Sequence, residues 1–153
     1  MLLYSFILLH LVAILYVISI ASNDNPSVGF RIAESLLRES FGTIHMARPV
    51  RTEPVGDHYP HQPFLNSAVA FRSSLPEAEV RSLLKEIELT LGRDDSKRRL
   101  HLVPIDLDII VVAGRVVHPD YLCLPFLPPL VQEAIPPDWL EKDLVLQITK
   151  RNE

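Results

Sequence analysis

Two carboxylates in the second half of the chain are the residues best suited to chemistry. Asp106 and Asp108 stand just before the apolar run 109–112, and such a run is typical of a strand inside a covered sheet. Because side chains alternate along a strand, both carboxylates point to the same side, roughly 6–7 Å apart. Two like charges held together favour a bound cation, and Mg²⁺ prefers oxygen ligands of this kind. Taken alone, this short motif is also consistent with a solvated strand end.

The segments that must position these carboxylates follow a regular order. Apolar residues recur at helical spacing over 26–41 and over about 75–91, and a glycine follows each of these stretches. Extended segments are expected at 16–20, 44–54, 64–72 and 103–112, with a tight turn and a short return strand at 113–118. This order predicts an α+β fold, a ferredoxin-like β-α-β-β-α-β sandwich with an added hairpin. Its helices cover one face of an antiparallel sheet, which leaves the other face to ligands.

Composition bounds the class of protein. A chain of 153 residues with 48% hydrophobic residues is long enough for one domain. We expect a hydrophobic N-terminal extension over 1–15, a domain over 16–137 and a tail over 138–153 whose secondary structure the sequence leaves open. A net charge of −4 gives no reason to expect nucleic acid. The single cysteine, Cys123, excludes an internal disulfide and fits a monomer in the reducing cytoplasm.

The N-terminal segment has two readings. Residues 1–22 contain no Asp, Glu, Lys or Arg, and roughly 20 apolar residues suffice to span a membrane. However, residues 16–20 alternate and are rich in β-branched side chains, as a first core strand would be. We therefore favour a hydrophobic extension over 1–15, with a membrane tether as the alternative.

A charged segment leads into the carboxylate strand. Residues 93–101 are predicted to form a polar loop that carries Lys97, Arg98 and Arg99. Cationic side chains this close to Asp106 could contact phosphate groups. A simple solvated connection is the alternative.

Assembled in order, these pieces resemble the 6-hydroxymethyl-7,8-dihydropterin pyrophosphokinase family over about residues 16–128. That family transfers the diphosphate of ATP to the hydroxymethyl group of a pterin in folate synthesis. The stretches that carry the resemblance are Ile18 to Asn23, Arg51 to Gly56, Phe64 to Val69, Ile87 to Arg93 and Ile105 to Ile109.

The resemblance implies roles on the pterin side of a site. Asn66 would hydrogen-bond the edge of the pterin, and Phe64 would stack on its ring. The segment that includes Thr52, Pro54 and Val55 would line the pterin pocket through its backbone.

It also implies roles on the ATP side. Asp106 and Asp108 would hold two Mg²⁺ ions that bridge the phosphates of ATP and the substrate hydroxyl, in agreement with the interpretation of the carboxylate pair. Glu88 and Arg93 match residues of the family near the nucleotide. Arg98 and Arg99 are expected to contact ATP as well, and Arg99 is also the expected catalytic cation.

Two departures from the family pattern keep alternatives open. Val103 stands where the family has an arginine on the phosphates, and Phe126 stands where it has a histidine on ATP. We expect an active Mg²⁺-dependent pyrophosphokinase. The alternatives are a pterin- or nucleotide-binding protein with weak or no catalysis, and a ferredoxin-like interaction module.

Overall fold

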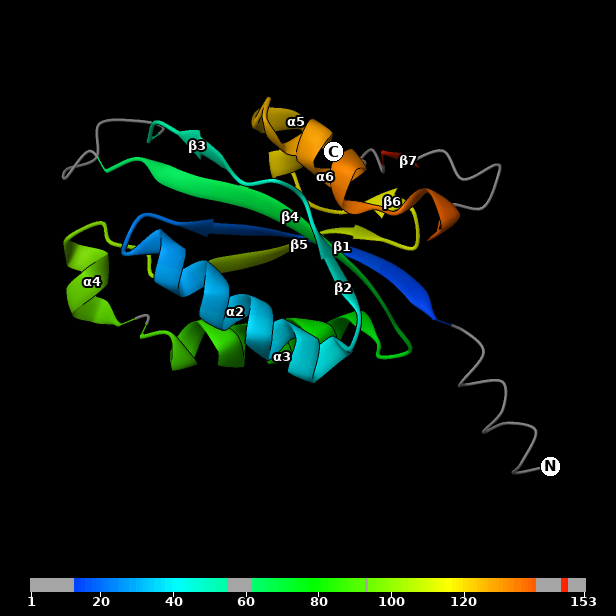
Figure 1. Cartoon of the computed structure of the whole chain (residues 1–153), viewed down its shortest axis with the longest axis horizontal. Helices are drawn as coiled ribbons and strands as arrows, with labels where there is room; N and C mark the ends of the chain where they lie inside the picture. The colour runs from blue at the N-terminus through cyan, green and yellow to red at the C-terminus, as the bar shows by residue number, and fades with distance from the viewer. Residues whose placement is uncertain (1–12, 55–61, 93, 140–146, 149–153) are drawn as a thin grey trace, which may run out of the picture.

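A computed structural model describes residues 13–54, 62–92, 94–139 and 147–148 of the chain. The order of the longer strands and helices follows the predicted β-α-β-β-α-β pattern, with further short elements (Figure 1). The strands are β1 (Ile14–Ser22), β2 (Ile44–Met46), β3 (Val50–Thr52), β4 (Phe64–Ser73), β5 (Asp106–Val112), β6 (Arg115–Val116) and β7 (Gln147–Ile148). The helices are α2 (Pro26–Phe41), α3 (Glu77–Thr90), α4 (Asp95–Arg99), α5 (Asp120–Cys123), α6 (Leu127–Ala134) and the 3-10 turn η1 (Pro137–Trp139).

The sheet is built around β1. Strands β4 and β5 flank it in antiparallel register, and the full order is β2-β4-β1-β5-β6-β7, with β3 also paired to β4. Only β7, which runs parallel to β6, departs from the antiparallel pattern among the described strands. The predicted α+β fold class, a ferredoxin-like sandwich with an added hairpin, is therefore confirmed.

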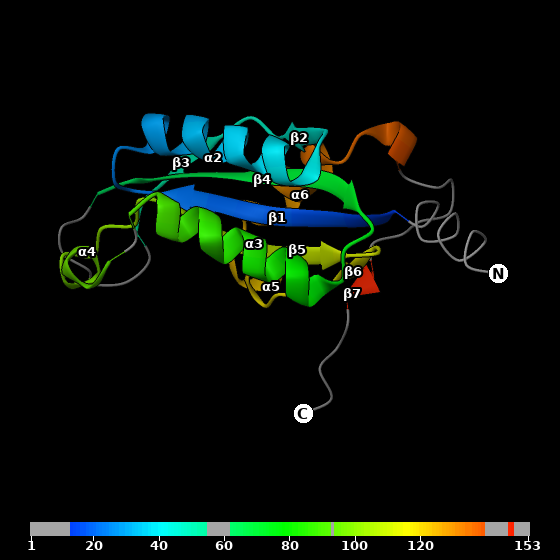
Figure 2. The same cartoon turned by 90° about the horizontal axis from the view of Figure 1, so that it is seen from below.

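One face of the sheet is covered by α2 and α3, which lie side by side (Figure 2). Alternate residues of β1, namely Tyr16, Ile18 and Ile20, are fully buried beneath them. Helix α2 comes very close to the segment before β5: a Cβ on Gly29 would lie 2.8 Å from the carbonyl oxygen of Pro104. Only a glycine fits this contact, which sets the start of the carboxylate strand against the helix layer.

The opposite face is divided into two parts. Leu15 and Val17 of β1 pack against Leu127 and Val131 of α6, which lies on this side of the sheet with α5 (Figure 1). The two helices on the other face agree with the prediction. The expectation that the face opposite them is left to ligands is correct only in part, because α6 covers some of it. Helix α6 covers only the first part of β1, and small residues follow beyond it.

The charged segment before β5 corrects one expectation. It was predicted as a loop, but residues 95–99 form the short helix α4. The carboxylate of Asp94 accepts hydrogen bonds from the Lys97 amide (2.8 Å) and from the hydroxyl of Ser96 (2.7 Å). This cap satisfies a backbone donor that the first turn of a helix leaves unpaired, and it lowers the pKa of Asp94.

The two ends of the chain were expected to lie outside the domain. The extension and the tether were predicted over residues 1–15, but β1 already begins at Ile14, so Ile14 and Leu15 belong to the sheet. Residues 1–12 lie outside the described residues. Among the residues that the structure describes, no helix has the length and hydrophobicity needed to cross a bilayer. In the tail, Trp139 packs against Arg72, whose guanidinium lies 4.4 Å from the ring centre.

Candidate active site

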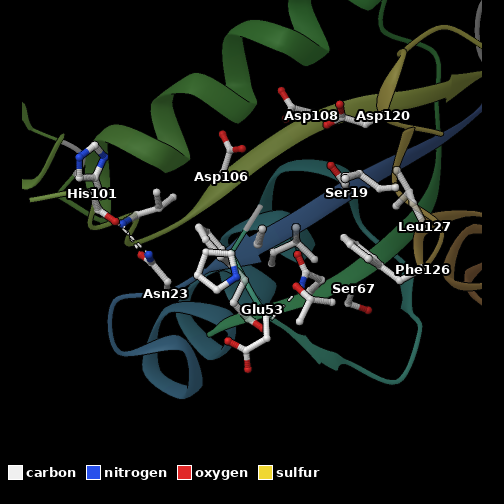
Figure 3. Close-up of a pocket in the computed structure, with 18 of the residues that line it drawn as sticks. Ser19, Asn23, Glu53, Ser67, His101, Asp106, Asp108, Asp120, Phe126 and Leu127 are labelled. Carbon is white, nitrogen blue, oxygen red and sulfur yellow. Dashed lines mark hydrogen bonds between the residues drawn. The ribbon is translucent and has the colours of Figure 1, made fainter. Parts of the chain in front are cut away.

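A cavity of about 410 Å³ occupies the part of the sheet face that α6 leaves uncovered (Figure 3). Its floor is the second half of β1, where Ser19 and Ala21 follow the larger Leu15 and Val17 on the same face. These short side chains leave the space that α6 fills elsewhere. The remaining lining residues are Ile20, Asn23, Thr52, Glu53, Pro54, Phe64, Asn66, Ser67, Arg98, His101, Leu102, Val103, Asp106, Asp108, Asp120, Leu124, Phe126 and Leu127.

One side of the cavity is an acidic wall, made of Asp106, Asp108 and Asp120. Asp106 pairs with Ala21 and Asp108 with Ser19 across the β1–β5 ladder. The two carboxylates therefore share one face, as predicted, and their strand partners are too small to cover them. All three aspartates are half-buried, and Asp120 joins them from the first turn of α5 (Figure 3).

The other side is an amide wall, made of Thr52, Phe64 and Asn66. Strands β3 and β4 pair Thr52 with Phe64, and the side-chain amide of Asn66 donates to Thr52 Oγ1 at 2.6 Å. Asn66 is only 7% exposed. A buried amide fixed in this way presents a defined hydrogen-bonding edge beside an aromatic ring, which suits a flat heterocycle.

Asn23 connects the end of β1 to the segment that enters β5. Its side chain donates to the carbonyl oxygen of His101 (2.9 Å) and accepts from the Val103 amide (2.6 Å), while its own amide donates to the Val103 carbonyl (3.0 Å). These three hydrogen bonds fix the segment 101–103 against the sheet. The side chain of Val103 lies on the cavity as an apolar group in the position where the resemblance expects a cation.

Glu88 lies behind the carboxylate strand and is absent from the cavity lining. It is 2% exposed, and its Oε1 accepts a hydrogen bond from the Leu107 amide at 2.9 Å. Leu107 stands between Asp106 and Asp108, so Glu88 holds the backbone of the acidic wall from the helix layer. Lys85 Nζ lies 3.7 Å from its second oxygen.

The predicted cations are placed differently from one another. Arg98 lines the cavity, whereas Arg99 is exposed and is not among the lining residues. Lys97 forms an ion pair with Asp24 (2.8 Å), which ties α4 to the turn after β1. Arg93, like Val55 on the pterin side, lies outside the described residues.

Carboxylates outnumber cations around this cavity. Among the described lining residues, Glu53 and the three aspartates of the acidic wall face a single arginine, Arg98. A polyphosphate would meet net repulsion here unless it arrived with a cation. Oxygen donors that share one face are the ligands with which Mg²⁺ is held beside phosphate, so the residues present fit that ion.

Asp120 and Asn23 are site residues to which sequence reasoning gave no role. Asp120 follows the predicted hairpin, and a hairpin returns the chain to the neighbourhood of the preceding strand. That signal was present in His118-Pro119-Asp120, two potential ligands shortly after a turn. Asn23 acts through backbone contacts that become visible only when the segments 22–24 and 101–103 are brought together.

Fold and cavity together define the class: a ferredoxin-like α+β protein whose open sheet face combines a carboxylate pair with a buried amide beside an aromatic ring. The chain belongs to the 7,8-dihydro-6-hydroxymethylpterin-pyrophosphokinase family, whose model matches residues 17–136. The predicted family is thus confirmed. Membership makes the chain an enzyme of the pterin pyrophosphokinase type, a transferase of folate synthesis that belongs with the ATP-using kinases.

Individual relatives agree with the family. The chain is 36% identical over 103 residues to proteins from two strains of Porphyromonas gingivalis, each named 2-amino-4-hydroxy-6-hydroxymethyldihydropteridine pyrophosphokinase. These matches cover 65% of this chain and 69% of each relative. It is also 32% identical over 112 residues to the folate synthesis bifunctional protein of Arabidopsis thaliana, covering 71% of this chain and 23% of that longer protein.

Proposed function

We propose that this protein transfers diphosphate from ATP to the hydroxymethyl group of 6-hydroxymethyl-7,8-dihydropterin, with Mg²⁺. The pterin hydroxyl oxygen forms a bond to the β-phosphorus of ATP and loses its proton, the bond between that phosphorus and the α,β-bridging oxygen breaks, and AMP leaves. One observation carries the proposal: the carboxylates of the acidic wall on β5 and the fixed amide of the amide wall on β4 line the same cavity.

On the acidic wall, Asp106 and Asp108 would hold two Mg²⁺ ions. When bound, these ions neutralise the phosphate oxygens and the charge that develops during transfer. The protein's part is to keep the two carboxylates at fixed places. Glu88 does this through the Leu107 amide, and Gly29 does it through its close approach to the segment before the strand.

On the amide wall, Asn66 would bind the polar edge of the pterin and Phe64 would stack on its ring. Thr52 orients the Asn66 amide through the 2.6 Å hydrogen bond. Pro54 lines the same side of the cavity, and Val55 is proposed beside it from the family resemblance. This wall selects and aligns the substrate without charge.

Arg98 is the cation that we propose for the phosphates of ATP. Its place in the lining supports this role, and α4 presents it through the Asp94 cap and the Lys97–Asp24 ion pair. For Arg99 and Arg93 the proposal of an ATP contact rests on the sequence resemblance. We propose that the enzyme acts as a monomer, as expected from the sequence. The exposed thiol of Cys123 is compatible with action in the reducing cytoplasm.

The test is formation of AMP by the purified full chain from Mg-ATP and 6-hydroxymethyl-7,8-dihydropterin. We expect AMP and the pterin diphosphate to appear in equal amounts, with none formed when the pterin or Mg²⁺ is left out. Absence of pterin-dependent AMP under these conditions would contradict the proposed activity.

A second candidate is a pterin- or nucleotide-binding protein without catalysis. The observation that favours it is the apolar Val103 on the wall where a phosphate-binding arginine is expected. Calorimetry separates the two: pterin binding without AMP formation would select the binding protein.

A further inference from the structure

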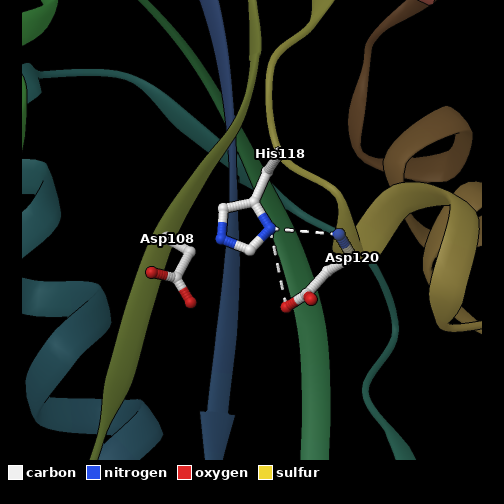
Figure 4. Close-up of side chains that lie close together, drawn as sticks. All are labelled: Asp108, His118 and Asp120. Atoms are coloured by element: carbon white, nitrogen blue, oxygen red, sulfur yellow. Dashed lines mark hydrogen bonds and ion pairs between the residues drawn. The ribbon is translucent and has the colours of Figure 1, made fainter. Parts of the chain in front are cut away.

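A histidine and two aspartates gather at the edge of the acidic wall. Asp108, His118 and Asp120 each offer a donor atom, and these atoms all lie within 4.8 Å of one another (Figure 4). Donor atoms that share an ion at about 2.0–2.2 Å lie at most about 4.4 Å apart. Side-chain adjustments of a few tenths of an ångström would therefore let all three reach one cation.

The fold fixes this group from two sides. Asp108 belongs to β5, and the β5–β6 hairpin returns the chain so that His118 and Asp120 come back beside it. The Asp120 amide donates to His118 Nδ1 at 3.1 Å, which holds the ring between the two carboxylates (Figure 4). Asp108 and Asp120 also line the cavity, so these residues would hold an ion at the edge of the substrate space.

We propose that Asp108, His118 and Asp120 form a binding site for a divalent transition-metal ion, with Mn²⁺ as the representative. One imidazole nitrogen with two carboxylates is a donor set used by Mn²⁺, Fe²⁺ and Zn²⁺, whereas Mg²⁺ prefers oxygen alone. The inference rests on the proposed function because Asp108 belongs to both metal sites. It adds His118 and Asp120 as ligands, and with them a preference among metals.

The protons can be placed for either ring nitrogen. If Nε2 binds the ion, the ring proton lies on Nδ1, the Asp120 amide loses its acceptor, and the Asp120 carboxylate oxygen, 3.6 Å away, must move closer to accept that proton in a hydrogen bond. If Nδ1 binds the ion, the ion replaces the Asp120 amide as the partner of that nitrogen. A merely structural His118 would keep only the amide contact, and this is the alternative that the experiment must separate.

The experiment is titration of the full chain with Mn²⁺ and, separately, Mg²⁺, followed by calorimetry without ATP or pterin. The variants are His118→Asn, which retains an acceptor for the Asp120 amide, and Asp120→Asn. We expect each to weaken Mn²⁺ binding by about tenfold to a hundredfold, and His118→Asn to leave Mg²⁺ binding nearly unchanged. His45→Asn and Asp138→Asn, at exposed positions away from the cavity, are the matched controls.

A second measurement uses the unmodified chain, so it does not depend on whether a variant folds. In pulsed electron paramagnetic resonance, Mn²⁺ bound to the unmodified chain should show modulation from a coordinated imidazole nitrogen. Absence of that modulation, or Mn²⁺ affinity that is equal in His118→Asn, would overturn the inference. AMP formation is assayed in parallel with Mg-ATP. If the chain is active but His118→Asn does not change Mn²⁺ binding, only the metal site is contradicted. If Mn²⁺ binds through His118 but no AMP forms, only the proposed function is contradicted.

Discussion

The acidic wall and the amide wall of the cavity differ in how far the protein itself completes them. The amide wall is closed by internal hydrogen bonding, since Thr52 fixes the Asn66 amide and strand pairing fixes Phe64. The acidic wall gathers three aspartates of like charge on one side of the cavity. The first wall is thus preorganised for a neutral ring, and the second becomes favourable only with cations. Under the proposed function, metal and nucleotide bind on the acidic side, and a change on one wall is expected to leave ligand binding on the other wall intact.

Removing a carboxylate from the acidic wall should have the largest effect. Asp106→Asn and Asp108→Asn are each expected to slow AMP formation by about a hundredfold or more, because even residues that merely support metal ligands matter by 10–100-fold. Pterin affinity, measured by calorimetry, should change little. Asp138→Asn, an exposed position in η1, is the control. Loss of pterin binding in the Asp106 or Asp108 variants would show that the walls are not independent.

Substitutions in the amide wall should weaken binding of the pterin and not of Mg-ATP. Asn66→Ala is expected to weaken pterin binding by about 1–3 kcal/mol, the usual consequence of leaving a polar partner unpaired, and to leave Mg-ATP binding intact. Thr52→Val retains the shape of the side chain but removes the Oγ1 acceptor, so it should produce part of the same loss. Calorimetry with each ligand separately checks both variants. An Asn66 variant that loses Mg-ATP rather than pterin would reverse the assignment.

Two neighbouring arginines on α4, Arg98 and Arg99, should differ in their effect on ATP binding. Arg98→Ala should raise the KM for ATP by about tenfold. This is near the lower end of the range of free energies for a hydrogen bond to a charged group, because Arg98 is exposed. Arg99→Ala, its neighbour outside the lining, should have a smaller effect. Steady-state kinetics at saturating pterin compares them. A larger loss for Arg99 would make it, rather than Arg98, the main cation on the phosphates.

Behind the acidic wall, Glu88 should matter for stability. Glu88→Ala leaves the buried Leu107 amide without its 2.9 Å partner, which should lower the free energy of unfolding by about 1–3 kcal/mol. Glu88→Gln keeps an acceptor and should cost less. Urea unfolding measures the difference, and Glu86→Ala, exposed on the same helix, is the control. Equal stability of the Ala and Gln variants would contradict the positioning role of this hydrogen bond.

The smallest effect is expected at the cap of α4. Hydrogen bonds from the Lys97 amide and the Ser96 hydroxyl lower the pKa of Asp94. Its contribution is therefore complete above the ordinary pKa of an aspartate and is lost as the pH falls through the lower folded-state pKa. Asp94→Ala should speed amide exchange in α4 alone, measured by NMR, whereas Asp95→Ala should not. Exchange unchanged by Asp94→Ala would remove the cap as the cause of the helix.

Features of the two walls that depend on neighbouring residues could be predicted from the sequence, and features that depend on distant residues could not. Asp106 and Asp108 were predictable as a pair because both stand on one strand, two residues apart. Helix α2 was predicted with its observed bounds because its apolar spacing is local. By contrast, His118 and Asp120 reach Asp108 only through the hairpin, and Glu88 acts through a partner 19 residues away. Helix α4 was missed because five polar residues depend on a cap and on the distant Asp24.

The central claim is that the acidic wall binds ATP through divalent cations, and calorimetric titration of ATP with and without Mg²⁺ tests it most directly. We predict that the unmodified chain binds ATP only when Mg²⁺ is present, and that the Asp106→Asn, Asp108→Asn double variant does not bind it in either condition. ATP affinity that is the same in the presence of EDTA, or that survives in the double variant, would contradict the account.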